Sequence, residues 1–244
     1  MILALVAFVA VGCASQETQE KYNENLKTRA RSHTDLGAVY FQQKQYEIAL
    51  EEFNTAIKIN PNYALAYNGL GLVNADLGKT KEADGYFRKA IELEPDNSES
   101  RNNYGTFLCG KNRYDESIVQ FMAAIKNPLY ATPAVAYTNA GICSISKNDL
   151  AGAEMYFQKA LQLDPLSGNA AYHLASSQFN RSDYVAAKKT LQNVLIAQPG
   201  PELLWLAIRN SRELEDKDEE ASYALQLRRL FPNSEQAKLL QSGR

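Results

Sequence analysis

Few side chains in this sequence could do covalent or metal chemistry. There are three cysteines (Cys13, Cys109 and Cys143) and two histidines (His33 and His173). Neither histidine has a cysteine or carboxylate at a spacing typical of a metal site, and no Ser/His/Asp or Cys/His set fits a catalytic arrangement. The sequence therefore predicts a protein that is not an enzyme and holds no metal.

Two stretches have the composition of ligand-binding loops but lack the required context. "GLGLVNADLG" (69–78) is glycine-rich, yet no strand precedes it, as a phosphate-binding loop would require. "EDKDEE" (215–220) lacks the alternating pattern of a calcium loop, and it suits the acidic first turn of a helix better. We expect no cofactor and no small-molecule substrate.

Cys13 has a different kind of chemical context. Residues 2–11 form an uncharged apolar run, which is too short to span a bilayer but has the length of a signal-peptide core. The small residues of "AVGC" (10–13) before Cys13 resemble a bacterial lipobox, although Ala10 stands where leucine is usual and no Lys or Arg precedes the run. This pattern predicts that residues 1–12 are removed and that the Cys13 thiol receives a diacylglycerol.

The residues after Cys13 bear on the alternative, a buried N-terminal helix. "SQETQEKYNENLK" (15–27) is too polar to continue such a helix. Ala14, where an aspartate would favour retention at the inner membrane, predicts sorting to the outer membrane. The expected location is thus the periplasmic side of the outer membrane, with residues 13–29 as a lipidated tether and N-terminal extension.

The charge of the chain argues against nucleic acid as a partner. The 26 Lys and Arg residues nearly balance the 28 Asp and Glu residues, and no basic block stands out. Phosphate binding needs a concentrated cationic surface. A protein partner fits this composition better.

A repeat of about 34 residues runs through most of the chain. Small residues recur and are followed four positions later by a large apolar residue, and prolines close the repeats. The small residues are Ala49, Ala83, Ser117, Ala153, Ala187 and Ala221, and the large ones are Phe53, Phe87, Phe121, Phe157, Leu191 and Leu225. A second register of small residues, at Gly37, Gly71, Gly105 and Gly141, lies upstream of the first.

This pattern resembles the tetratricopeptide repeat (TPR), in which each repeat is a pair of antiparallel helices, A and B. No repeat can bury its apolar face alone, so the predicted fold is all-α, a right-handed superhelix of about six repeats. The predicted repeats are 30–63, 64–97, 98–133, 134–167, 168–201 and a degenerate 202–233, followed by a cap at 234–244.

In such a superhelix the A helices line a concave groove. The side chains expected there are apolar or carry amides, which suit a peptide, and we expect no Lys or Arg near them beyond Arg31 and Arg101. Alternatively, some of them pack between neighbouring A helices. The predicted partner-binding residues are Phe41, Leu65, Asn68, Leu72, Asn102, Thr106, Asn139, Ile142, Tyr172 and Phe179.

Cys109 and Cys143 occupy nearby positions of successive A helices. A disulfide is feasible, since an oxidising compartment favours it, but two buried free thiols are the alternative.

The third and fourth repeats carry a more specific signal. "NNYGTFLC" (102–109), "NPLYATP" (127–133) and "NAGIC" (139–143) resemble the PilF/PilW family of type IV pilus biogenesis and stability lipoproteins. The resemblance implies a pilotin, an outer-membrane lipoprotein that helps the pilus secretin to localise and form multimers. It also implies that Cys109 and Cys143 match a cysteine pair that can be oxidised. A periplasmic TPR lipoprotein that recruits cell-wall hydrolases or proteases stays open as an alternative.

Overall fold

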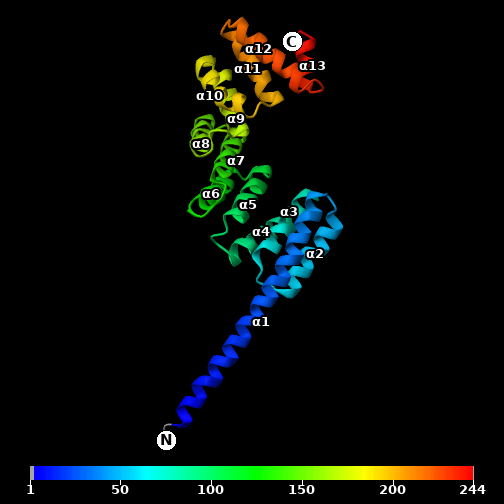
Figure 1. Cartoon of the computed structure of the whole chain (residues 1–244), viewed down its shortest axis with the longest axis vertical. Helices are drawn as coiled ribbons and strands as arrows, with labels where there is room; N and C mark the ends of the chain where they lie inside the picture. Colours follow the sequence, from blue (N-terminus) through cyan, green and yellow to red (C-terminus); the bar gives the residue numbers. More distant parts are fainter. Residues whose placement is uncertain (1–2, 244) are drawn as a thin grey trace. The chain divides into compact units, whose positions relative to one another are not determined.

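The computed structural model describes residues 3–243, and the side chains of residues 19–243. The described residues form thirteen α-helices and no strand, as the sequence predicts. In chain order the helices are α1 (Leu3–Gln42), α2 (Tyr46–Ile59), α3 (Ala64–Asp76), α4 (Thr80–Leu93), α5 (Ser98–Gly110), α6 (Tyr114–Ile125), α7 (Pro133–Ser146), α8 (Leu150–Leu163), α9 (Gly168–Asn180), α10 (Tyr184–Ala197), α11 (Pro201–Glu213), α12 (Lys217–Leu230) and α13 (Glu235–Gln241) (Figure 1).

Tight turns make the helices into pairs. A three-residue turn joins each odd-numbered helix from α1 to α11 to the helix that follows it. The central residue of every such turn has a positive φ, a conformation that reverses the chain directly after a helix. These residues are Lys44, Gly78, Asn112, Asn148, Ser182 and Glu215. Six repeated turns of one geometry give the helix-turn-helix pattern of the TPR fold.

The chain forms two compact units, residues 1–107 and 108–244. In the first unit, Phe53 and Phe87 of the B helices α2 and α4 fill the core. Phe87 also contacts the rings of Tyr104 and Phe107 from α5, with centroids 5.6 Å and 5.3 Å away. The recurring aromatic residue therefore packs between its own repeat and the next one.

Glycines of the A helices make room for these rings. A Cβ atom on Gly69 would lie 2.3 Å from the Phe53 ring, and one on Gly71 would lie 2.8 Å from the Phe87 ring. In the second unit, a Cβ atom on Gly141 of α7 would lie 2.5 Å from the Phe157 ring of α8. The paired spacing of glycine and phenylalanine in the sequence is thus a requirement of close helix packing.

The second unit ends in a larger apolar core. Buried side chains of α9 to α13 join there, among them Leu191, Leu204, Ile208, Leu227 and Leu240. The short helix α13 covers this core through Ala237 and Leu240, and Ser234 caps its N-terminus by accepting a hydrogen bond from the backbone N–H of Ala237.

The sixth repeat corrects the register that the sequence suggested. Ala221 and Leu225 were expected in the core, but Ala221 is exposed and Leu225 is 65% exposed. Ala224 and Leu227 are buried in their place. The physical reason is a shorter connection: residues 198–200 join α10 to α11, whereas residues 164–167 join α8 to α9. One residue fewer shifts the register of the sixth repeat by one, so Ala224 rather than Leu225 is the equivalent of Leu191.

Helix α1 extends well before the first repeat. Residues 19–29 are exposed apart from Leu26, which is half-buried, and Ala30 is the first buried side chain among those described. The stretch expected to be a tether is therefore helical, and its residues 19–29 are largely exposed to solvent. No helix among the described residues is long and apolar enough to cross a membrane.

Candidate partner-binding site

The predicted groove residues all lie on A helices, in two sets. Those in the first unit come from α1, α3 and α5, and those in the second unit come from α7 and α9. The first set is Phe41, Leu65, Asn68, Leu72, Asn102 and Thr106, and the second is Asn139, Ile142, Tyr172 and Phe179.

In the first unit one of these residues is not on the surface. Asn68 is only 6% exposed, and its Oδ1 accepts a hydrogen bond from Asn103 Nδ2 at 3.4 Å. Its amide links α3 to α5 rather than facing a partner, which corrects the sequence-based expectation. Leu65 and Leu72 remain half-buried at the surface of α3, although Leu65 also packs on the core.

In the second unit, Tyr172 and Phe179 line a surface pocket of about 200 Å³. Their neighbours come from three helices that lie side by side, α9, α11 and α13. The other lining residues are Ser176, Asn180, Glu202, Trp205, Leu206, Arg209 and Gln236. A cavity of about 150 Å³ is large enough for a benzene molecule, so this pocket has room for one large side chain.

Helical spacing places these side chains on one face. Tyr172, Ser176 and Phe179 are at positions i, i+4 and i+7 of α9, and Glu202, Leu206 and Arg209 have the same spacing on α11. Residues at this spacing lie above one another along a helix. Two facing helices thus present two parallel rows of side chains to the pocket.

The pocket carries two charges, and each is free of an ion pair within residues 19–243. The Arg209 guanidinium lies 4.5 Å from the centroid of the Phe179 ring, and the Glu202 carboxylate accepts a hydrogen bond from Gln236. The expectation that no arginine lies near the groove beyond Arg31 and Arg101 is therefore wrong, since Arg209 lines this pocket.

A second arginine on α11 has a structural role. The Arg212 guanidinium lies 5.7 Å from the centroid of Trp205, and its Nε contacts Glu220 Oε1 at 2.6 Å. This ion pair joins α11 to α12 and holds the guanidinium beside the indole ring. The Trp205 ring thus contacts the Arg212 guanidinium and also lines the pocket.

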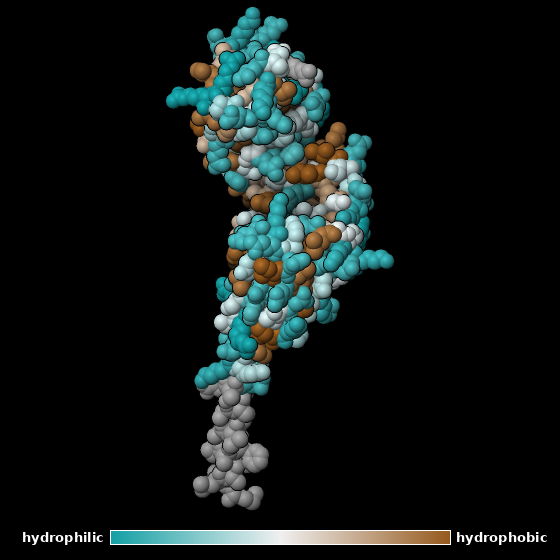
Figure 2. Space-filling view, turned by 90° about the vertical axis from the view of Figure 1, so that its right-hand side faces the viewer, coloured by the Kyte–Doolittle hydropathy of each residue, from teal (hydrophilic) through white to brown (hydrophobic). Residues whose placement is uncertain are grey.

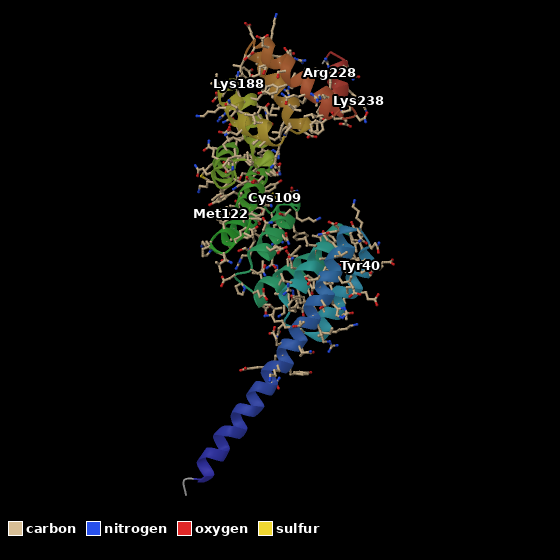
Figure 3. All side chains as sticks on the ribbon, viewed as in Figure 1. Tyr40, Cys109, Met122, Lys188, Arg228 and Lys238 are labelled. Carbon is tan, nitrogen blue, oxygen red and sulfur yellow. A yellow bond between two sulfur atoms is a disulfide. The ribbon has the colours of Figure 1, made fainter. Side chains whose placement is uncertain are left out.

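A polar network behind the pocket fixes α11 and α12. Lys188 Nζ lies 3.1 Å from Asp216 Oδ2 and 3.0 Å from Glu219 Oε2, and Ser211 donates to the same Glu219 oxygen (Figure 3). A hydrogen bond from the Glu219 backbone N–H, with the Lys188 contact second, holds the pKa of Asp216 below its usual range. The same two carboxylates raise the pKa of Lys188, Glu219 more than Asp216.

The two histidines lie in separate units and contact different groups. His33 Nδ1 lies 2.7 Å from Glu52 Oε2, between α1 and α2. His173 stacks on Phe157 with ring centroids 5.3 Å apart, and burial lowers the pKa of its imidazole. Within the chain's described part, no group of three or more His, Cys, Asp or Glu side chains could hold a metal ion.

Cys109 of α5 and Cys143 of α7 form a disulfide, with Cα atoms 5.7 Å apart (Figure 3). The bond closes a loop that contains α6, and Cys143 is fully buried. Of the two readings that the sequence left open, the structure has the bonded pair. The side chain of Cys13, the predicted lipidation site, lies outside the described side chains.

With this geometry in hand, comparisons with known proteins become informative. Models described as TPR or tetratricopeptide repeats match residues 37–78, 64–97, 86–119 and 144–209. The type IV pilus assembly protein PilF of Pseudomonas aeruginosa is 32% identical over 239 residues, which cover 95% of this chain and 94% of PilF. The chain belongs to the PilF/PilW family of type IV pilus proteins.

Solved structures of the PilF/PilW family agree with this assignment. The structure of Pseudomonas aeruginosa PilF matches with a TM-score of 0.75 and 30% identity, over 90% of this chain and all of the PilF chain. A crystal structure of PilW, described as a widely conserved type IV pilus biogenesis factor, matches with a TM-score of 0.72 and 28% identity, over 87% of this chain and 98% of PilW.

Sequence reasoning found three of the pocket residues of this PilF/PilW family member, Tyr172, Ser176 and Phe179, and missed those on α11. The predicted groove positions of the fifth repeat were residues 169, 172, 176 and 179. The same positions moved by 33 residues are Glu202, Trp205, Arg209 and Arg212. The sixth repeat has Ile208 in place of the small residue of the motif, so the repeat pattern does not mark its A helix clearly.

Proposed function

We propose that this protein is a pilotin of the type IV pilus system: an outer-membrane lipoprotein that binds secretin subunits and promotes their localisation and multimerisation. The observation that carries the proposal is the match to a type IV pilus assembly protein along nearly the whole of both chains. A match of this extent includes the N-terminal extension as well as the repeats, so it supports a shared role rather than only a shared repeat fold.

The surfaces of the two units support a protein-binding role. Each has half-buried apolar side chains on its A helices, such as Leu72 in the first unit and Ile142 in the second. In Figure 2 hydrophobic atoms gather in separate patches between hydrophilic ones. Extended segments of a partner can dock on surfaces of this kind, with apolar anchors in pockets and polar groups around them.

The geometry of α1 suits an anchored scaffold. If Cys13 carries lipid, the 17 residues from Cys13 to Ala30 place the first buried residue about 25 Å along the helix axis from the membrane anchor. The acyl chains hold the protein at the bilayer, and the exposed helix keeps the repeats within reach of it. Secretin subunits that bind there are brought together at the membrane, and their higher local concentration favours the formation of multimers.

Binding to the secretin is tested with the purified full-length chain and periplasmic fragments of the secretin subunit. The expected result is saturable binding that the paired substitutions Leu72→Lys and Ile142→Lys weaken while the circular dichroism spectrum stays unchanged. Binding of cell-wall hydrolases in place of secretin fragments would favour an adaptor role and refute the pilotin.

The anchor is tested separately by Cys13→Ala. We expect the variant protein in the soluble periplasmic fraction, because the thiol that accepts the lipid is gone. Ser15→Ala, two residues away, is the matched control and should stay with the outer membrane. Persistent membrane association of the Cys13→Ala protein would refute lipidation at this residue.

A further inference from the structure

The pocket between α9, α11 and α13 carries one acidic and one basic side chain, Glu202 and Arg209. Helix α11 forms one wall of the pocket, with Glu202 at one end of the wall and Arg209 at the other. The aromatic side chain of Trp205 and the aliphatic side chain of Leu206 lie between them. Seven residues of helix separate the two charges, a rise of about 10 Å. About three residues of an extended peptide cover the same distance.

Neither charge is satisfied by an ion pair inside the protein. Arg209 has a cation–π contact with Phe179 at 4.5 Å and makes no salt bridge with any residue from 19 to 243. By contrast, Arg212, one turn further along α11, is paired with Glu220, and Arg181 is paired with Glu154. The contact with the ring positions the guanidinium and leaves its N–H groups for a carboxylate from outside.

The pocket is also the right size for one anchor. Its volume of about 200 Å³ accepts a single aromatic or large aliphatic side chain, and its wall offers the rings of Tyr172, Phe179 and Trp205. Ser176, Asn180 and Gln236 lie at its border, where they can bond to the backbone of a bound segment.

From these observations we infer that this pocket binds an extended internal segment of the partner protein in which a large apolar residue lies between a basic and an acidic residue. The apolar side chain enters the pocket, the basic group contacts Glu202, and the acidic group contacts Arg209. A free C-terminus would use Arg209 alone and leave Glu202 without a partner, so an internal segment fits both charges better. The inference rests on the proposed role as a secretin-binding scaffold and specifies one site for it.

Trp205 makes the test direct, because it is the only tryptophan in the chain and lines the pocket. The purified full-length protein is titrated with tryptophan-free peptides in Gly/Ser flanks, and Trp205 fluorescence is followed. The bipolar peptide contains Lys-Ala-Phe-Asp. Of the three control peptides, one has lysine at both charged positions, one has aspartate at both, and one has alanine in place of phenylalanine. We expect the bipolar peptide to bind about fivefold or more tightly than each of the others.

Charge reversal of the pocket gives the sharper result. Arg209→Glu leaves two carboxylates at the pocket, so the preference should change from the bipolar peptide to the doubly basic one. Arg228→Glu is the matched control, since Arg228 is an exposed arginine of the same unit that does not line the pocket (Figure 3). Equal affinity for all peptides, or the same change with Arg228→Glu, would overturn the inference.

A cellular arm separates this inference from the proposed function. Strains that carry Arg209→Glu should form fewer SDS-resistant secretin multimers than strains that carry Arg228→Glu. Normal multimers with Arg209→Glu, in a system where deletion abolishes them, would refute the pocket as the secretin site and leave the pilotin role intact. Normal multimers after deletion would refute the pilotin role itself, whatever the peptides show.

Discussion

Gly69 offers a direct test of how the repeats pack. A Cβ atom at this position would lie 2.3, 2.4 and 2.7 Å from three atoms of the Phe53 ring, well inside van der Waals contact. The same ring atoms would lie 2.9–3.1 Å from a Cβ atom on Gly37 of α1, so two A helices approach this ring closely and leave it little room to shift. Phe53 is also 2% exposed and packs against Leu70 and Val73.

The magnitude follows from two opposing effects. Alanine in place of glycine stabilises a helix interior by up to about 1 kcal/mol. Overpacking a filled core costs about 1–3 kcal/mol, and a buried ring that two helices approach this closely should be near the upper end of this range. We therefore expect Gly69→Ala to lower the free energy of unfolding by about 2 kcal/mol, which corresponds to a fall of about 4–8 °C in Tm.

Gly85 is the matched control in the same unit. It lies in helix α4, and a Cβ atom there would meet nothing within 4 Å. Gly85→Ala should therefore raise stability by up to about 1 kcal/mol through helix propensity alone. Circular dichroism at 222 nm during thermal and urea unfolding measures both variants.

A double-mutant cycle identifies the cause. Phe53→Leu shortens the side chain that the new methyl group meets. The double variant Gly69→Ala, Phe53→Leu should therefore lose at least about 1 kcal/mol less free energy of unfolding than the sum of the losses in the two single variants. Strict additivity, or a stability gain with Gly69→Ala, would refute the account of close packing between glycine and phenylalanine.

Three further predictions concern the disulfide, a histidine and a turn. Replacing Cys109 and Cys143 together by serine should cost up to about 4 kcal/mol, as expected for a loop of 34 residues, and reductant should lower the Tm of the native protein but not of this variant. Burial lowers the pKa of His173 from 6.5, so the unfolded chain binds the proton first and the free energy of unfolding should fall as the pH drops below 6.5. In urea unfolding between about pH 7.5 and 5.5, the His173→Phe variant should lose less free energy of unfolding than the native protein. Equal losses would contradict this. Glu215 has a φ of 57°, so Glu215→Gly should stabilise the protein by about 1 kcal/mol. Gly78 has a φ of 73° in the equivalent turn, so Gly78→Ala should destabilise the protein by a similar amount. A change of the same sign in both variants would refute the role of backbone strain.

Much of the fold was readable from the sequence because its constraints are local and repeated. A glycine such as Gly71 or Gly141 and a phenylalanine 16 residues later fix how closely two helices approach. Four copies of that constraint, with prolines that end the B helices, specify the helix pairs and their order. Leu191 in place of phenylalanine changes the volume but not the register, and it is buried as expected.

The sixth repeat could not be read in the same way because its side-chain volumes are exchanged. Ile208 stands where the preceding repeats have Gly141 and Ala175, and Ala224 stands where they have a large residue. A sequence search for alanine and leucine therefore selected Ala221 and Leu225, one residue out of register. Arg209 lies next to this position, at the equivalent of the groove residue Ser176, so the least regular repeat also contributes to the candidate site.

Burial of polar side chains was the other feature beyond the reach of the sequence. Asn68 occupies a position that faces the groove in the repeat pattern, but its amide pairs with Asn103 of the next A helix. Whether an asparagine meets a partner or a neighbouring helix depends on how far apart two A helices lie, which single-residue patterns do not specify.

A deletion strain shows whether this protein promotes secretin assembly at the outer membrane. The gene is deleted, and the SDS-resistant secretin multimers in outer-membrane fractions are quantified with and without the protein restored from a plasmid. The account predicts that multimers and surface pili are lost on deletion and return with the native protein but not with Cys13→Ala. Unchanged multimers and normal surface pili in the deletion strain would contradict it.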